Sequence, residues 1–355
     1  MQRLMSLAML AVLLGGGYTA LNTLLPSNVR QAVDQAGAVL QQRAGQQSGY
    51  SGYDRSATGY APAPAAPASV IRIASYNIQV FGNKKAADAN VMRTLAAVVQ
   101  QFDIVAIQEI RTTDQDFIDK FLSGYVNASG RRYSRVVGPR LGRTSSKEQY
   151  AFLFDTATIQ VNPNYIYTVR DEDDVLHREP HVAMFATRAP QNPFTFILMN
   201  CHTDPDETDT ELNELARSID AVRRHASSYL SPPEDDVILL GDLNTAVRIS
   251  PTRQLRPDDL YGIGRIAGIY PVIRTEPTNT VRSKLHDNLL VNRMATTEFT
   301  GNSGVYDLER QFGLTRDQAL QVSDHLPVWA EFSVVEGGTP GRLASGRPQQ
   351  PGIAR

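Results

Sequence analysis

The sequence predicts an α/β domain between about residues 70 and 335, flanked by segments of different composition. Two observations support this fold class. Apolar runs with the two-residue period of strands alternate along the chain with runs that have the period of helices. Polar clusters follow several of the apolar strands, as in α/β proteins whose strand ends carry the functional residues.

The first strand–helix–strand unit lies at the beginning of this domain. Residues 70–76 are rich in β-branched side chains and predict a strand. Apolar residues at helical spacing between 91 and 102 predict a helix. The continuous apolar run 104–107 predicts a strand that is buried on both faces.

A second unit of the same kind follows. Residues 194–199 and 237–240 are apolar and predict strands, and residues 212–229 between them have helical periodicity. Thr208 and Glu211 have the spacing of a capping box at the start of that helix. Further strands are expected at 151–154, 181–186, 288–291 and 327–332.

The two ends of the chain differ from the domain between them. Arg3 precedes an apolar run, and residues 1–25 predict either a cleaved signal peptide or an uncleaved membrane anchor, since the run approaches the roughly 20 residues of a membrane span. Residues 26–69 predict a short helix followed by a disordered linker, and 336–355 a disordered tail. We therefore expect an exported protein, periplasmic or extracellular, that is either free or held at the membrane by its N-terminus.

Composition excludes several classes of site. The formal net charge is −2, so contacts with a nucleic acid must come from a local basic patch rather than from the charge of the whole protein. Cys201 is the only cysteine, which rules out an intramolecular disulfide. The sequence contains no Cys/His cluster with zinc spacing.

Carboxylates and amides stand at the ends of the apolar strands. Glu109 comes just after a buried strand, where its side chain suits a hard cation such as Mg²⁺. Asp242 and Asn244 follow the strand 237–240 and offer a metal ligand or base and an amide. Taken alone, the Glu109 motif is also typical of a solvated strand end, and the Gly241–Asn244 motif is also typical of a turn.

Two histidines occupy similar positions. His202 ends the strand that begins near residue 194, and His325 follows Asp324 in the motif Ser323-Asp-His325. A histidine moves protons near neutral pH when a carboxylate orients it. Cys201, next to His202, is interpreted as a buried apolar side chain.

Taken together and in order, these motifs resemble the endonuclease/exonuclease/phosphatase superfamily, and within it the deoxyribonuclease I type. The resemblance covers about residues 70–333. It rests on the stretches 71–77, 102–111, 141–154, 178–180, 202–205, 241–244, 286–287 and 323–325. It implies a four-layer α/β sandwich, in which helices flank two mixed β-sheets, and a metal-dependent endonuclease that hydrolyses DNA.

The resemblance also implies roles for individual residues. The catalytic set would be Glu148, His202, Asp242, Asp287 and His325, in which Glu148 orients His202 and Asp287 orients His325. The metal set would be Asn77, Glu109 and Asp324, with Asp242 and Asn244 beside them. The phosphate-binding set would be Arg111, Arg143, Arg178 and Asn244. The expected cofactor is Mg²⁺, with Mn²⁺ or Ca²⁺ as alternatives, and the expected substrate partner of the monomer is DNA.

The superfamily also hosts enzymes that act on substrates other than DNA, and the chain departs from the deoxyribonuclease I pattern, whose calcium-binding loops are not recognisable in 266–286. Secreted members of the family carry disulfides, which this chain cannot form, and Ser146 stands where the enzyme presents a tyrosine to the minor groove. One alternative is a membrane-associated phosphodiesterase or phosphatase acting on phospholipid headgroups or inositol phosphates. Another is a catalytically inactive binding module.

Overall fold

The computed structural model describes residues 69–143, 147–250 and 252–337. The predicted leader, the linker up to residue 68, the tail from residue 338 and Ser146 lie outside the described residues. Among the helices of the described part, none has the length and apolar character needed to cross a membrane.

Twelve strands form two six-stranded sheets. The first sheet has the order β11-β12-β1-β2-β4-β3, with β1 (Val70–Phe81), β2 (Ile104–Ile110), β3 (Tyr133–Val137), β4 (Gln149–Asp155), β11 (Phe299–Val305) and β12 (Val328–Ser333). The second has the order β5-β6-β7-β8-β10-β9, with β5 (Ile159–Thr168), β6 (His181–Thr187), β7 (Thr195–His202), β8 (Val237–Val247), β9 (Ile269–Pro271) and β10 (Leu285–Asn292). Both sheets are mixed, because β1 pairs with β2 and β7 with β8 in parallel while the remaining pairs are antiparallel.

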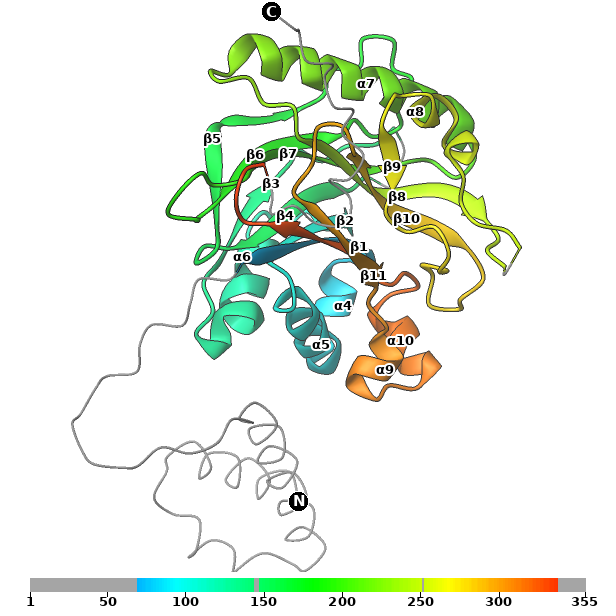
Figure 1. Cartoon of the computed structure of the whole chain (residues 1–355). Coiled ribbons are helices and arrows are strands. Elements are labelled where there is room, and N and C mark those ends of the chain that lie inside the picture. Colours follow the sequence, from blue (N-terminus) through cyan, green and yellow to red (C-terminus); the bar gives the residue numbers. More distant parts are fainter. Residues whose placement is uncertain (1–68, 144–146, 251, 338–355) are drawn as a thin grey trace, which may run out of the picture. The chain divides into compact units, whose positions relative to one another are not determined.

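Helices cover the outer face of each sheet (Figure 1). The second sheet is covered by α7 (Thr208–Tyr229) and α8 (Tyr261–Gly264), with the short turn η3 (Pro257–Leu260) before α8. The first sheet is covered by α4 (Asn83–Ala86), α5 (Ala89–Val99), α6 (Phe117–Phe121), α9 (Leu308–Phe312) and α10 (Arg316–Val322), with the turns η1 (Leu122–Val126) and η2 (Asn127–Ser129) after α6. The predicted four-layer α/β sandwich is confirmed.

Strand alternation separates two apolar cores and aims the polar residues. In β1, Ile71 and Ile73 belong to the core between the sheets, whereas Tyr76 and Ile78 belong to the core beneath the helices of the first sheet. Asn77 has the parity of Ile71 and Ile73, so its side chain points between the two sheets. The same alternation that builds the core therefore brings a polar side chain to its edge.

The strands and helices predicted from periodicity are confirmed, whereas β3, β5, β9 and β11 were not predicted. The capping box at α7 is wrong. The buried Glu211 carboxylate instead accepts hydrogen bonds from the backbone N–H of Asp204 at 2.6 Å and of His177 at 2.5 Å. Thr208 donates its hydroxyl to the Asp204 carbonyl. Glu211 thus fastens two loops to the helix, a use that local spacing does not reveal.

A buried amide cluster joins the two sheets near their middle. Asn200 on β7 donates its side-chain N–H₂ to the backbone carbonyls of Ile107 at 3.1 Å and Ala151 at 3.3 Å in the first sheet. The Gln108 amide on β2 donates to Asn200 Oδ1 at 2.6 Å and to the Ser75 hydroxyl at 3.1 Å. Asn200 and Gln108 are fully buried, so these bonds fix how the sheets face each other.

We expect Asn200→Leu to lower the free energy of unfolding by about 1–3 kcal/mol, because the substitution removes one acceptor of the buried Gln108 amide and the Asn200 donor to two buried carbonyls. Urea denaturation followed by circular dichroism measures this change. Asn164→Leu, at an exposed position of β5, is the control and should change stability by no more than about 0.5 kcal/mol. Equal effects of the two substitutions would contradict the bridging role.

Candidate active site

Three neighbouring strands of the second sheet carry three of the predicted catalytic residues side by side. The parallel register of β7 and β8 places His202 opposite Asp242, and the antiparallel register of β8 and β10 places Asp287 opposite Asp242. Because adjacent strands lie about 4.8 Å apart, the three side chains form a row across the end of the sheet.

The first sheet and its loops supply the other half of the site. Asn77 lies on β1 and Glu109 on β2, while Asp324 and His325 lie in the loop before β12. This loop is tied to β1, because the Ser323 hydroxyl donates to the Asn77 carbonyl at 2.7 Å. The site therefore depends on the two sheets keeping their relative position.

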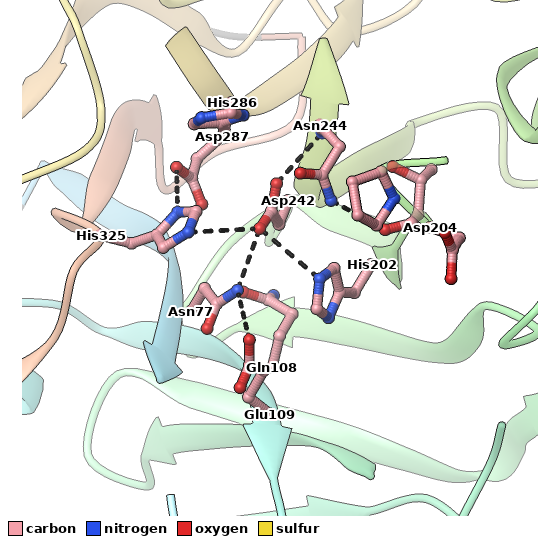
Figure 2. A network of polar contacts seen from close by, with 12 residues as sticks. Asn77, Gln108, Glu109, His202, Asp204, Asp242, Asn244, His286, Asp287 and His325 are labelled. Carbon is pink, nitrogen blue, oxygen red and sulfur yellow. Dashed lines mark hydrogen bonds and ion pairs between the residues drawn. The ribbon is translucent and has the colours of Figure 1, made fainter. Parts of the chain in front are cut away.

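Each histidine is held by its own buried carboxylate, and Figure 2 shows the pair of His325 with Asp287. His202 Nδ1 lies 2.9 Å from Glu148 Oε1, and His325 Nδ1 lies 2.8 Å from Asp287 Oδ2. The Nε2 atoms of both rings lie 3.6 Å from Asp242 Oδ2. The structure thus brings together the five residues of the predicted catalytic set, with Asp242 between two imidazoles.

The charges of this row shift the proton affinities of its members. Burial alone would lower the pKa of His325, but the Asp287 and Asp242 carboxylates raise it to about 10. Burial also opposes the charged form of His202, yet Glu148 raises its pKa above the usual value. Burial would raise the pKa of Asp242, but the two histidines help lower it to about 2. These shifts favour the protonated form of both imidazoles and the charged form of Asp242.

Asn77 and Glu109 extend the network away from Asp242. The Asn77 side-chain N–H₂ donates to Asp242 Oδ2 at 2.9 Å and lies 3.4 Å from Glu109 Oε1. Glu109 Oε2 accepts from the Val80 backbone N–H at 2.8 Å. Glu109 has a φ of 63° and Asn244 a φ of 46°, left-handed conformations that cost energy for residues other than glycine. Strain of this kind concentrates at functional sites.

Oxygen atoms of the predicted metal set fit a divalent cation. Asn77 Oδ1 and Asp324 Oδ1 are buried and have no hydrogen-bond partner among the described residues. With the Glu109 carboxylate they form an oxygen-only donor set of the kind that Mg²⁺ or Ca²⁺ prefers. Ligand atoms of Asp242, Asp287 and His325 also lie within 4.8 Å of one another.

Asn244 supports the centre of the row. Its backbone N–H donates to Asp242 Oδ1 at 3.0 Å, and its side-chain amide donates to the Thr203 carbonyl at 2.8 Å. These bonds hold Asp242 and the loop after β7 in place. The predicted contact of Asn244 with metal or phosphate stays a prediction.

The three predicted phosphate-binding arginines lie in different environments. Arg111 is partly exposed, with its Nε 3.3 Å from Glu109 Oε2 and an Nη atom 3.7 Å from Glu148 Oε2. Arg178 is buried and donates to the His202 carbonyl at 3.1 Å. Arg143 pairs with Asp174 at 3.3 Å. Arg111 is therefore the arginine nearest the metal set, while Arg178 supports the strand end that bears His202.

Sequence reasoning missed several supports of this site. Thr278 donates its hydroxyl to Asp287 Oδ2 at 2.7 Å, and the Gln79 amide donates to Asp324 Oδ2 at 2.9 Å. No sequence signal marks Thr278, because it becomes a neighbour of Asp287 only in the folded chain. The His286 ring lies 5.6 Å from the His325 ring, and its position next to Asp287 in the sequence was a usable signal.

Comparison with known proteins places the site in a family. The model of the Endonuclease/Exonuclease/phosphatase family matches residues 74–325, a span that includes all the site residues described above. The chain is 32% identical over 272 residues to deoxyribonuclease-1-like 1 of Chlorocebus aethiops, covering 75% of this chain and 86% of that protein. It is 29% identical over 276 residues to deoxyribonuclease gamma of Rattus norvegicus, covering 73% and 83%.

A solved structure supports the fold alone. The crystal structure of humanized D. rerio TDP2, carrying 14 mutations, is similar with a TM-score of 0.51 and 14% sequence identity, over 75% of this chain and 100% of that chain. The family match covers more than half of the chain and includes both histidines. This chain belongs to the Endonuclease/Exonuclease/phosphatase family.

Proposed function

We propose that this protein is a metal-dependent endonuclease that hydrolyses phosphodiester bonds of DNA. The observation that carries the proposal is the pair of histidines, each bound to a buried carboxylate and each 3.6 Å from Asp242. Relatives named as deoxyribonucleases, about 30% identical over most of the chain, support DNA as the substrate.

The histidine pair is suited to the proton transfers of hydrolysis. Cleavage requires that a proton leaves the attacking water and that another reaches the departing sugar oxygen. One imidazole donates a proton to the leaving oxygen. The raised pKa values of His202 and His325 favour the protonated form that this step needs. The other imidazole, once deprotonated, accepts the proton of water, and Asp242 is the alternative acceptor between them.

A divalent cation would complete the site. Asn77, Glu109 and Asp324 would hold it, with Asp242 and Asn244 beside them, and we propose Mg²⁺ as the ion. When bound, it supplies positive charge close to the scissile phosphate. This chain's own contribution is the preorganised arrangement of its oxygen ligands and of the two imidazoles.

A basic cavity beside the metal set supports a polyanionic substrate. A cavity of about 350 Å³ is lined in part by Lys84, Arg111 and Arg140. These three cations form a local patch on a chain whose net charge is −2. Since the Arg111 Nε also lies 3.3 Å from Glu109 Oε2, the patch adjoins the predicted metal set, where a phosphate backbone would be held.

We expect Glu109→Gln to reduce DNA cleavage by at least about 100-fold, because the substitution removes a charged metal ligand. Cleavage of supercoiled plasmid in Mg²⁺ and in EDTA measures the loss. Glu172→Gln, at an exposed position, is the control. Full activity of the wild-type protein in EDTA would contradict the metal requirement, and faster hydrolysis of sphingomyelin or an inositol phosphate than of plasmid would contradict DNA as the substrate.

His202→Ala and His325→Ala are each expected to lower kcat by about 10²–10⁴-fold, with KM much less affected. The double variant should lose less than the product of the two, because the two rings act as one unit. Single-turnover cleavage of a duplex oligonucleotide measures these changes. His225→Ala, at an exposed position of α7, is the control, and near-wild-type kcat of His202→Ala would favour Asp242 as the base.

Asp287→Asn tests the orientation and the charge of His325 together. Asp287 and Asp242 raise the pKa of His325 to about 10, so loss of one carboxylate charge should lower it. If protonated His325 is the acid, the alkaline limb of the pH–rate profile should move to lower pH and kcat should fall in part. An unchanged alkaline limb would exclude His325 as the group that this limb reports.

We propose that the protein is exported, on the basis of the apolar N-terminal sequence. Fractionation of cells that express the full chain with a C-terminal tag should recover it outside the cytoplasm. A shortened N-terminus would indicate cleavage of a signal peptide, and an intact N-terminus in the membrane fraction would indicate an anchor. An intact N-terminus on cytosolic protein would refute export.

A further inference from the structure

Four acidic residues gather at the far end of β8 from the catalytic row. Glu234 and Asp236 lie just before β8, Glu298 just before β11, and Glu336 after β12. Asp236 and the catalytic Asp242 are six positions apart along extended chain, which corresponds to about 20 Å. The cluster is therefore separate from the active site and takes its members from both sheets.

Three of these carboxylates are buried and Glu336 is partly buried, and none of the four pairs with a cation among the described residues. The exposed fraction is 2% for Asp236, 1% for Glu298 and 5% for Glu234. The charged groups that act on Asp236 are Glu298, Glu234 and Glu336, all of which are acidic. Burial and these neighbours raise the pKa of Asp236 to about 9. Buried carboxylates require either protons or a bound cation.

Hydrogen bonds position the cluster but leave several of its oxygens free. Glu298 Oε1 accepts from the Gly337 N–H at 2.5 Å, and Glu336 Oε2 accepts from the Thr195 N–H at 3.1 Å. Glu298 Oε2 and Asp236 Oδ1 are buried and have no hydrogen-bond partner among the described residues. Asp236 and Glu298 thus each have an oxygen available for another ligand.

A threonine provides an observation independent of the acidic residues. Thr296 is 3% exposed, and its hydroxyl oxygen is buried without a hydrogen-bond partner in the described part of the chain. This hydroxyl faces the Asp236 carboxyl group. Ligand oxygens of Asp236, Glu298 and Glu336 lie within 4.8 Å of one another. Together with the Thr296 hydroxyl, these atoms form a site lined by oxygen alone.

We propose that Asp236, Glu298 and Glu336, together with Thr296, bind a calcium ion. The donor set contains only oxygen, which favours a hard cation over zinc or copper. Ca²⁺ accepts six to eight oxygen ligands, from protein and water, with flexible geometry, whereas Mg²⁺ demands a near-regular octahedron and usually keeps several waters. A buried cluster of carboxylates and a hydroxyl therefore suits Ca²⁺ better than Mg²⁺.

The ion would fasten the segment after β12 to the second sheet. The Glu336 backbone N–H donates to the Asn192 carbonyl at 2.8 Å, and the Asn192 side-chain amide donates to the Glu336 carbonyl at 2.9 Å. Thr195, the first residue of β7, donates its hydroxyl to Glu234. Neutralising the carboxylates would stabilise this junction without any contact with the catalytic row.

The test is calcium binding by the full chain, measured by titration calorimetry and by melting temperature in CaCl₂ and in EDTA. At 100-fold excess over Kd, calcium should raise the melting temperature by about 5–10 °C. Asp236→Asn and Glu298→Gln should each remove one bound calcium and most of this shift. Asp220→Asn, at an exposed position of α7, should keep both.

Glu109→Gln separates this site from the catalytic metal set and should retain the calcium that Asp236→Asn loses. Calcium binding near pH 7 should also release protons, because the ion displaces them from the carboxyl groups. The proposal is overturned if the wild-type protein binds no calcium that depends on Asp236 or Glu298. It is also overturned if Asp236→Asn raises the melting temperature equally in calcium and EDTA, since the cluster would then be held by shared protons.

Discussion

The structure of the candidate active site depends on the charge of Asp242. This carboxylate is 1% exposed, so water cannot stabilise it, and its neighbours must do so. Asn77 donates to it from the first sheet, the Asn244 backbone N–H donates from its own strand, and the imidazoles of His202 and His325 face it from opposite sides. One buried anion thus requires both sheets to be in place, which couples the site to the packing of the whole sandwich.

The outer carboxylates extend this arrangement by one layer. Glu148 faces Arg111 at 3.7 Å and Arg178 at 3.8 Å as well as His202, and these cations help to hold its pKa below the usual value against the effect of burial. Asp287 is held by the hydroxyl of Thr278. The two histidine–carboxylate pairs are therefore supported differently, one by charge and the other by a neutral donor. Removal of either outer carboxylate would affect the orientation of the ring and its proton affinity together.

The buried carboxylates of Asp242, within β8, and of Asp236, just before β8, have opposite electrostatic surroundings. Asp242 faces two histidines, and its pKa is lowered to about 2. The charged neighbours of Asp236 are all acidic, and its pKa is raised to about 9. The difference arises from the neighbours, because both residues are almost completely buried. The short apolar stretch between them therefore connects the active site, where histidines of the chain balance the charge of Asp242, with an acidic cluster whose charged neighbours are all carboxylates.

The sequence by itself determined the α/β class, the strand ends that bear the functional residues and the identity of Glu109, Asp242 and the two histidines as candidates. It could do so because strand period and polar strand ends are local patterns. Only the tertiary structure decided that Arg178 lies buried behind His202 and that Glu211 fastens two loops rather than capping α7. Partners of that kind come from segments far apart in the chain, and their distances are set by the packing of the two sheets, which no local pattern encodes.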